Sequence, residues 1–157
     1  MHDQDADGGL PQWYEEFMAL PGELSELEQI TALSGDTWAL VFSDEQLLTV
    51  EATDRPGVLA LSVILGPVPQ GREQQLYETA LSVNLLWRDT DGLRLGLAGS
   101  GGDMVLSREV TVTGVAGLTD AILALRTFAA GWRTLAHSAA PDDPSALLEP
   151  SRIGHLV

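Results

Sequence analysis

Residues 35–66, GDTWALVFSDEQLLTVEATDRPGVLALSVILG, decide the fold. Large apolar residues stand at every second position in three short runs, which begin at Trp38, Leu48 and Leu59. A period of two is typical of a β-strand that buries one face. The polar tripeptides SDE and RPG separate the runs and suit tight turns. The segment therefore predicts an antiparallel meander of three strands.

Downstream of the meander the apolar spacing becomes helical. Residues 71–86 predict an amphipathic helix, because apolar side chains recur about one helical turn apart at Leu76, Ala80, Leu81 and Leu85. Alternation returns in residues 93–97 and again in residues 104–112, on either side of a glycine-rich hairpin loop. A last helix is expected to have Thr119 as its N-cap, and its apolar stripe contains Ile122, Leu125, Phe128, Ala129 and Trp132.

Upstream of the meander, the sequence predicts one helix and a link. Trp13, Phe17 and Leu20 recur at helical spacing, and Pro21-Gly22 ends that helix. Residues 23–33 are interpreted as a second helical turn or an irregular link, since one helical face would hold Leu24, Leu27 and Ile30.

The order of these elements predicts an α+β fold, an α-β-β-β-α-β-β-α protomer with a twisted, mainly antiparallel sheet and helices packed on it. Apolar residues make up 45% of the 157, which is enough for one core. We expect a single domain over residues 10–137. Residues 1–9 are expected to be a disordered acidic N-terminus, and residues 138–157, which contain three prolines, a flexible tail.

Charge and cysteine content exclude several classes of partner. With 8 basic and 23 acidic residues the formal charge is −15, which repels nucleic acid and anionic membrane surfaces. There is no cysteine, and the N-terminus carries aspartates where a secretory signal needs an apolar run. We therefore expect a cytoplasmic protein that binds neither nucleic acid nor membrane.

No motif predicts catalysis, a metal or a cofactor. The pattern Asp3-x-Asp5-x-Asp7-Gly8 imitates the start of a calcium loop, but the twelfth position, where such a loop needs a bidentate glutamate, is Tyr14. The glycines at 99, 101 and 102 precede a strand, whereas a phosphate-binding loop opens a helix. Because the three histidines, His2, His137 and His155, have no ligand partner at helical spacing, the chain is not expected to be an enzyme.

Two segments together resemble a known family. One is LGPVP at residues 65–69 followed by a helix that ends in ALSVNLL at residues 80–86. The other is LRLGL at residues 93–97, a glycine-rich turn, MVLSREV at residues 104–110 and the last helix. Over residues 38–135 the chain resembles the class I chaperones of bacterial type III secretion, the group that includes the translocated-receptor chaperones.

The resemblance implies a homodimer that holds the N-terminal segment of one or more effectors extended, soluble and ready for export. The implied activity needs no cofactor in the chaperone. The resemblance also allows the ATPase of the secretion apparatus as a further partner. The residues implied for effector binding are Trp13, Phe17, Leu40, Phe42, Leu48 and Val50. Those implied for the dimer interface are Leu76, Leu81, Leu85, Leu93, Leu95 and Leu97.

A second interpretation stays open at this point. An acidic immunity protein, or a regulatory domain of similar topology that binds another protein, has the same composition. The neighbouring gene, for an effector or for a toxin, distinguishes the two.

Overall fold

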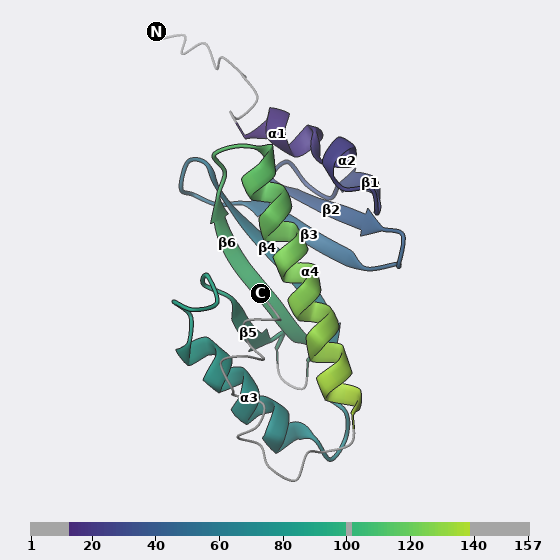
Figure 1. The fold of residues 1–157 in the computed structure, drawn as a ribbon, viewed down its shortest axis with the longest axis vertical. Coiled ribbons are helices and arrows are strands. Elements are labelled where there is room, and N and C mark those ends of the chain that lie inside the picture. Colours follow the sequence, from purple (N-terminus) through teal and green to yellow (C-terminus); the bar gives the residue numbers. More distant parts are fainter. Residues whose placement is uncertain (1–12, 100–101, 139–157) are drawn as a thin grey trace, which may run out of the picture.

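The computed structural model describes residues 13–99 and 102–138, which form one sheet with helices on it (Figure 1). The predicted extremes, residues 1–9 and 138–157, lie outside the described residues except for Ser138. In chain order the described elements are α1 (Tyr14–Met18), α2 (Leu20–Glu23), β1 (Leu27–Ala32), β2 (Thr37–Phe42), β3 (Leu47–Ala52), β4 (Val58–Gly66), α3 (Glu73–Leu85), β5 (Arg94–Leu97), β6 (Met104–Thr111) and α4 (Val115–His137).

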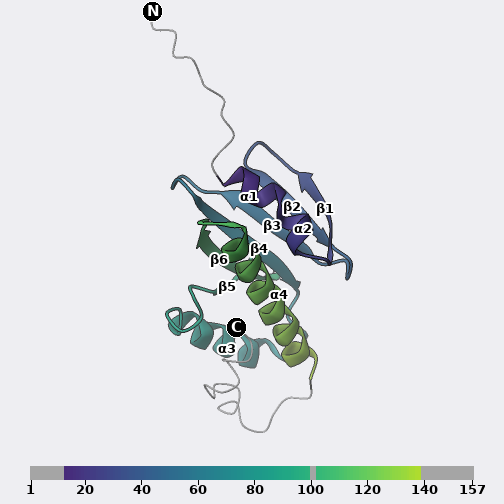
Figure 2. The same ribbon diagram turned by 45° about the horizontal axis from the view of Figure 1, so that its top comes forward.

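The six strands form one antiparallel sheet in the order β1-β2-β3-β4-β6-β5, so the α+β prediction is confirmed. The predicted meander is present as β2, β3 and β4. Helix α4 runs across one face of the sheet, and α1 and α2 lie beside it on the same face (Figures 1 and 2). Helix α3 lies at the far end of the sheet and packs against β5.

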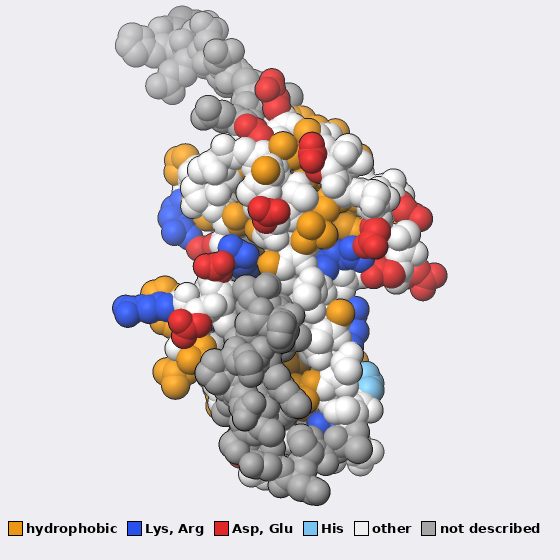
Figure 3. All heavy atoms as spheres, in the orientation of Figure 1, with side chains coloured by type: hydrophobic (Ala, Val, Ile, Leu, Met, Phe, Trp, Pro, Cys, Tyr) orange, Lys and Arg blue, Asp and Glu red, His pale blue; other side chains and the backbone are white. Residues whose placement is uncertain are grey.

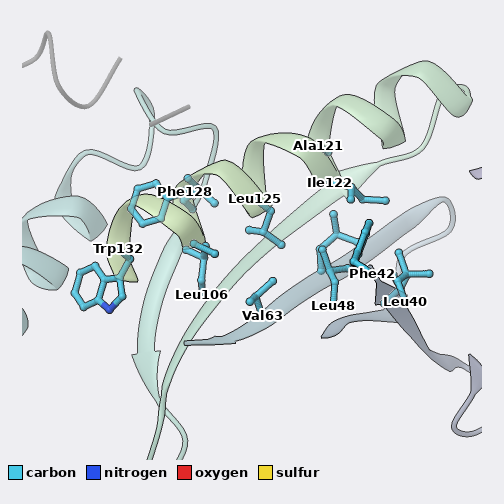
Figure 4. Close-up of a cluster of buried hydrophobic side chains, with 14 of the residues drawn as sticks. Leu40, Phe42, Leu48, Val63, Leu106, Ala121, Ile122, Leu125, Phe128 and Trp132 are labelled. Atoms are coloured by element: carbon cyan, nitrogen blue, oxygen red, sulfur yellow. The ribbon is translucent and has the colours of Figure 1, made fainter. Parts of the chain in front are cut away.

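One row of apolar residues crosses all six strands beneath α4. Paired positions in neighbouring strands place these side chains side by side, in the order Ile30, Leu40, Leu48, Val63, Leu106 and Leu95. Figure 4 shows the middle of this row facing Ile122, Leu125 and Phe128 of α4. Burying one such side chain stabilises the fold by about 1.5–3 kcal/mol, so the row and the helix hold each other in place.

The prediction for residues 23–33 was wrong in its second half, because residues 27–32 form strand β1. The reason is a β-bulge between Leu27 and Gln29. Leu27 pairs with Phe42 and Ile30 with Leu40, so both point to the covered face although they are three residues apart. A bulge inserts one extra residue and therefore turns a period of two into the helical spacing that the sequence displays.

The predicted start of the last helix was also wrong. Helix α4 begins at Val115, after Gly114, and Thr119 lies inside it. Leu118 is fully buried and precedes Ile122 by one turn, so the apolar stripe starts a turn earlier than predicted. The hydroxyl of Thr119 is buried without a hydrogen-bond partner among the described residues, which is not the geometry of an N-cap.

Candidate partner-binding surfaces

The six residues implied for effector binding all lie in the core. Trp13 is 7% exposed and the other five are at most 1% exposed. The ring centroid of Trp38 lies 5.2 Å from that of Trp13 and 5.3 Å from that of Phe17, which fixes α1 on strand β2. These side chains hold the first helix and the first strands together rather than forming an exposed patch, and their contact with an effector stays a prediction.

The six residues implied for the dimer interface divide into two sets of three. Leu76, Leu93 and Leu95 are at most 6% exposed and pack between α3 and the sheet. The other three are exposed, by 69% for Leu81, 80% for Leu85 and 47% for Leu97. Helix α3 therefore has two apolar stripes, of which one is covered and one is open.

The open stripe belongs to an apolar surface, which we call the α3–β5 surface and define by Tyr77, Leu81, Leu85 and Leu97. A shallow hollow of about 250 Å³ lies within it. Beneath this surface Asn84 holds α3 against β5. Its amide nitrogen donates to the carbonyl of Leu95 at 2.9 Å, and its amide oxygen accepts from the Leu95 N–H at 2.8 Å. Exposed apolar surfaces of this kind mark sites where another protein binds.

Strand β1 is the free edge of the sheet at the other end. It pairs with β2 on one side, and no strand of the described chain lies on its other side. The turn that follows is well fixed, since the hydroxyls of Ser34 and Thr37 donate to Asp36 and lower the pKa of its carboxyl. A free strand edge presents backbone N–H and C=O groups to which an extended peptide can add.

The sheet face opposite α4 also carries apolar side chains, which we call the open-face row. Val41 pairs with Leu47, and Ile64 pairs with Val105, on four neighbouring strands. Leu47 is 56% exposed and Ile64 is 62% exposed. This row begins one strand away from the β1 edge, so an extended segment on that edge could reach it with its side chains.

Arg126 of α4 fixes the beginning of the β1 edge, and the sequence reasoning missed it. Its guanidinium donates to Gln46 at 3.0 Å and to Asp44 at 2.7 Å, and it pairs with Glu26, next to β1. The same group lies 3.9 Å from the ring centroid of Phe42. The available signal was a single charge inside an apolar run, AILALRTFAA at residues 121–130.

The described residues hold no cluster of three His, Asp or Glu side chains with the arrangement of a metal site. His137 lies at the end of α4, whereas His2, His155 and the three aspartates of the calcium-like motif fall outside the described residues. Within the described ranges, no helix combines the length and the apolar character that crossing a bilayer requires.

Comparison with known proteins gives a family and a fold. The model of the Tir chaperone protein (CesT) family matches residues 22–127. A chain of the HopA1-SchA chaperone-effector complex matches with a TM-score of 0.59 at 21% identity, over 77% of this chain and 93% of that chain. A chain of the heterodimeric ExoU-SpcU complex from the type III secretion system of Pseudomonas aeruginosa matches with a TM-score of 0.58 at 22% identity, over 77% of this chain and 95% of that chain.

A chain of the ExsC-ExsE complex gives a TM-score of 0.59 at 17% identity, over 83% of this chain and 100% of that chain. At these identities the likeness to solved structures establishes the fold. No curated protein matches the chain.

Proposed function

The chain belongs to the Tir chaperone protein (CesT) family, and we propose that it is a type III secretion chaperone. It binds the N-terminal segment of one or more effectors in extended form and keeps that segment soluble and competent for export. The observation that carries this proposal is the family match over residues 22–127, which includes the whole sheet and the first half of α4. The alternative of an immunity or regulatory protein is not favoured by this family.

The β1 edge and the open-face row support the extended binding mode. Backbone groups of an added strand would pair with β1, and every second side chain of that strand would face the open-face row. Ordering a disordered segment costs about 2–5 kcal/mol or more, and each fully buried Leu or Val anchor returns about 1.5–3 kcal/mol. A segment with several apolar anchors is therefore the expected cargo.

The α3–β5 surface supports a homodimer. A two-fold axis brings the same patch of both copies together, so Leu81 and Leu85 of one protomer would be covered by the equivalent patch of the other. Desolvating these exposed leucines is favourable, whereas leaving them in water is not. The dimer would offer two β1 edges for one effector segment.

This function places the chain in the cytoplasm, where cargo waits before export. The chaperone itself would need neither ATP nor metal, and the ATPase of the secretion apparatus would be the partner that receives the complex.

The test is capture of cargo from the native host followed by limited proteolysis. The purified chain serves as bait, the retained protein is identified by mass spectrometry, and protease is added to the complex. We expect the retained protein to be trimmed to a fragment from its own N-terminal region, because an extended segment on the chaperone is protected while the rest is not. Retention through a folded toxic domain would support an immunity protein and contradict the proposal.

A further inference from the structure

The open stripe of helix α3 carries opposite charges at its two ends. Its exposed residues are Gln74, Glu78, Leu81 and Leu85, and Arg88 follows in the turn after the helix. Successive members of this set are four, three, four and three residues apart, so they fall on one side of the helix. Two exposed leucines therefore lie between a carboxylate and a guanidinium.

The turn after α3 keeps Arg88 close to the line of this stripe. The N–H of Leu86 donates to the carbonyl of Ser82 at 3.3 Å, and the N–H of Thr90 donates to the carbonyl of Leu86 at 3.1 Å. Both bonds join residues four apart, which is the spacing of an α-helix. The backbone therefore follows a helical path for about one more turn beyond the end of α3.

A neighbouring side chain positions each of the two charges. The amide nitrogen of Gln74 donates to the carboxylate of Glu78 at 3.0 Å, and the guanidinium of Arg88 lies 5.1 Å from the ring centroid of Trp87. No ion pair joins Glu78 or Arg88 to another of the described residues. Exposed charges that are held in place in this way suit a partner with the opposite charge at the matching position.

A second copy of the chain offers opposite charges at the matching positions. Alternating spacings of three and four are typical of helices that pack side by side. If two copies of α3 lie antiparallel with a two-fold axis level with Val83, Leu81 of each copy faces the partner's Leu85, and Glu78 faces the partner's Arg88. A parallel pair would instead bring like charges together, Glu78 against the partner's Glu78.

We propose that Glu78 and Arg88 determine which chain pairs at the α3–β5 surface. They select a second copy with its α3 antiparallel, and each Glu78 pairs with the partner's Arg88 at the ends of a contact formed by leucines. Two such pairs also offset part of the repulsion between chains that each carry −15. This inference rests on the homodimer of the proposed function and adds its register and the residues that decide it.

Charge reversal at these two positions tests the register. Glu78→Arg places the new guanidinium against the partner's Arg88, and Arg88→Glu places the new carboxylate against the partner's Glu78. Like charges across a contact are unfavourable, so each variant should raise the dissociation constant of the dimer by about tenfold or more. Sedimentation equilibrium at low salt measures this constant, and about 0.5 M salt should reduce the difference. Both residues are exposed, so each variant should still unfold cooperatively.

Two combinations should restore association. The E78R/R88E double variant exchanges the charges within one chain and should form a homodimer again, which an antiparallel pair allows and a parallel pair does not. An equimolar mixture of E78R and R88E should form a mixed dimer, which native mass spectrometry identifies. As matched controls, D120R and R133E make the same charge changes on α4 and should leave the dissociation constant unchanged.

The outcomes separate the register from the dimer itself. A wild-type dimer whose dissociation constant is unaffected by E78R and R88E would overturn this inference and leave the homodimer standing. A double variant that stays monomeric would also overturn it. If the wild-type chain is itself monomeric and Leu81→Glu abolishes cargo capture, the stripe binds cargo, and the inference and the homodimer are both wrong.

Discussion

Arg126 connects parts of the chain that lie 80 to 100 residues apart in sequence. Its side chain is 11% exposed, and it satisfies Gln46, which is itself buried. The carboxylates of Glu26 and Asp44 are more than half exposed, so the contribution of each ion pair is screened by solvent. The hydrogen bond to buried Gln46 and the stacking on Phe42 carry most of the stabilisation.

Replacing this arginine is the first prediction at the residue scale. Arg126→Gln should lower the free energy of unfolding by roughly 1–3 kcal/mol, because Gln46 loses its partner and the ring of Phe42 loses its cover. Arg133→Gln on the same helix removes no hydrogen bond or ion pair made within the described residues and should change the free energy of unfolding by less than about 0.5 kcal/mol. Denaturant unfolding measures both. Equal effects would show that Arg126 acts only through its charge.

A second prediction concerns the six buried residues that the resemblance implies for effector binding. Phe42→Ala should lower the free energy of unfolding by about 3–5 kcal/mol, as expected for a large aromatic side chain removed from a packed core. Thermal unfolding and cargo capture are measured on the same variant. Normal melting with lost capture would mean that Phe42 meets the effector directly, in contradiction to its burial.

At the scale of elements, helix α3 carries apolar residues on two faces, and only one of these faces is covered. Leu76 and Leu81 both belong to its apolar positions, yet Leu76 is fully buried and Leu81 is 69% exposed. Helical period predicts which residues share a stripe, but a helix with two stripes needs the position of its neighbours to decide which stripe is covered. The division of the interface residues therefore could not be predicted from spacing alone.

The same limit explains why strand β1 was not predicted from the sequence. The meander was predictable because three runs keep a strict period of two between clear turns, whereas the bulge after Leu27 breaks that period. The cationic partner of the β1 edge, Arg126, was equally hidden. Arg126 meets Glu26 and Asp44 only after α4 crosses the sheet, and no local pattern reports a contact over that sequence distance.

The α3–β5 surface gives a prediction that separates folding from association. The wild-type chain should show about twice its 16.8 kDa mass by light scattering at micromolar concentration. Leu81→Glu should be monomeric and still unfold cooperatively, because the new charge is solvated in the monomer and buried only in the dimer, and its melting temperature should fall only by the part that association contributes. Leu95→Glu should instead unfold, since Leu95 lies in the core.

This pair of variants is its own control, because both introduce the same charge, Leu81→Glu on the exposed α3–β5 surface and Leu95→Glu in the core. A wild-type chain that stays monomeric at high concentration, or a Leu81→Glu variant that remains dimeric, would contradict the homodimer.

At the scale of the whole molecule, the arrangement has one covered face and several open surfaces. Helices α1, α2 and α4 cover one side of the sheet, while the β1 edge, the open-face row and the α3–β5 surface are exposed (Figure 3 shows apolar side chains among the charged ones on one side). A charge of −15 opposes non-specific association through these surfaces, and a homodimer through the α3–β5 surface would carry −30.

Export of the captured cargo is the measurement that tests the central claim most directly. The gene for this chain is deleted in the native host, and the amount of the captured protein released through the type III apparatus is compared with that of a second exported protein. We expect export of the captured protein to be lost while export of the second protein is unaffected, and we expect export to return with the wild-type gene. Undiminished export of the captured protein in the deletion strain would contradict the account.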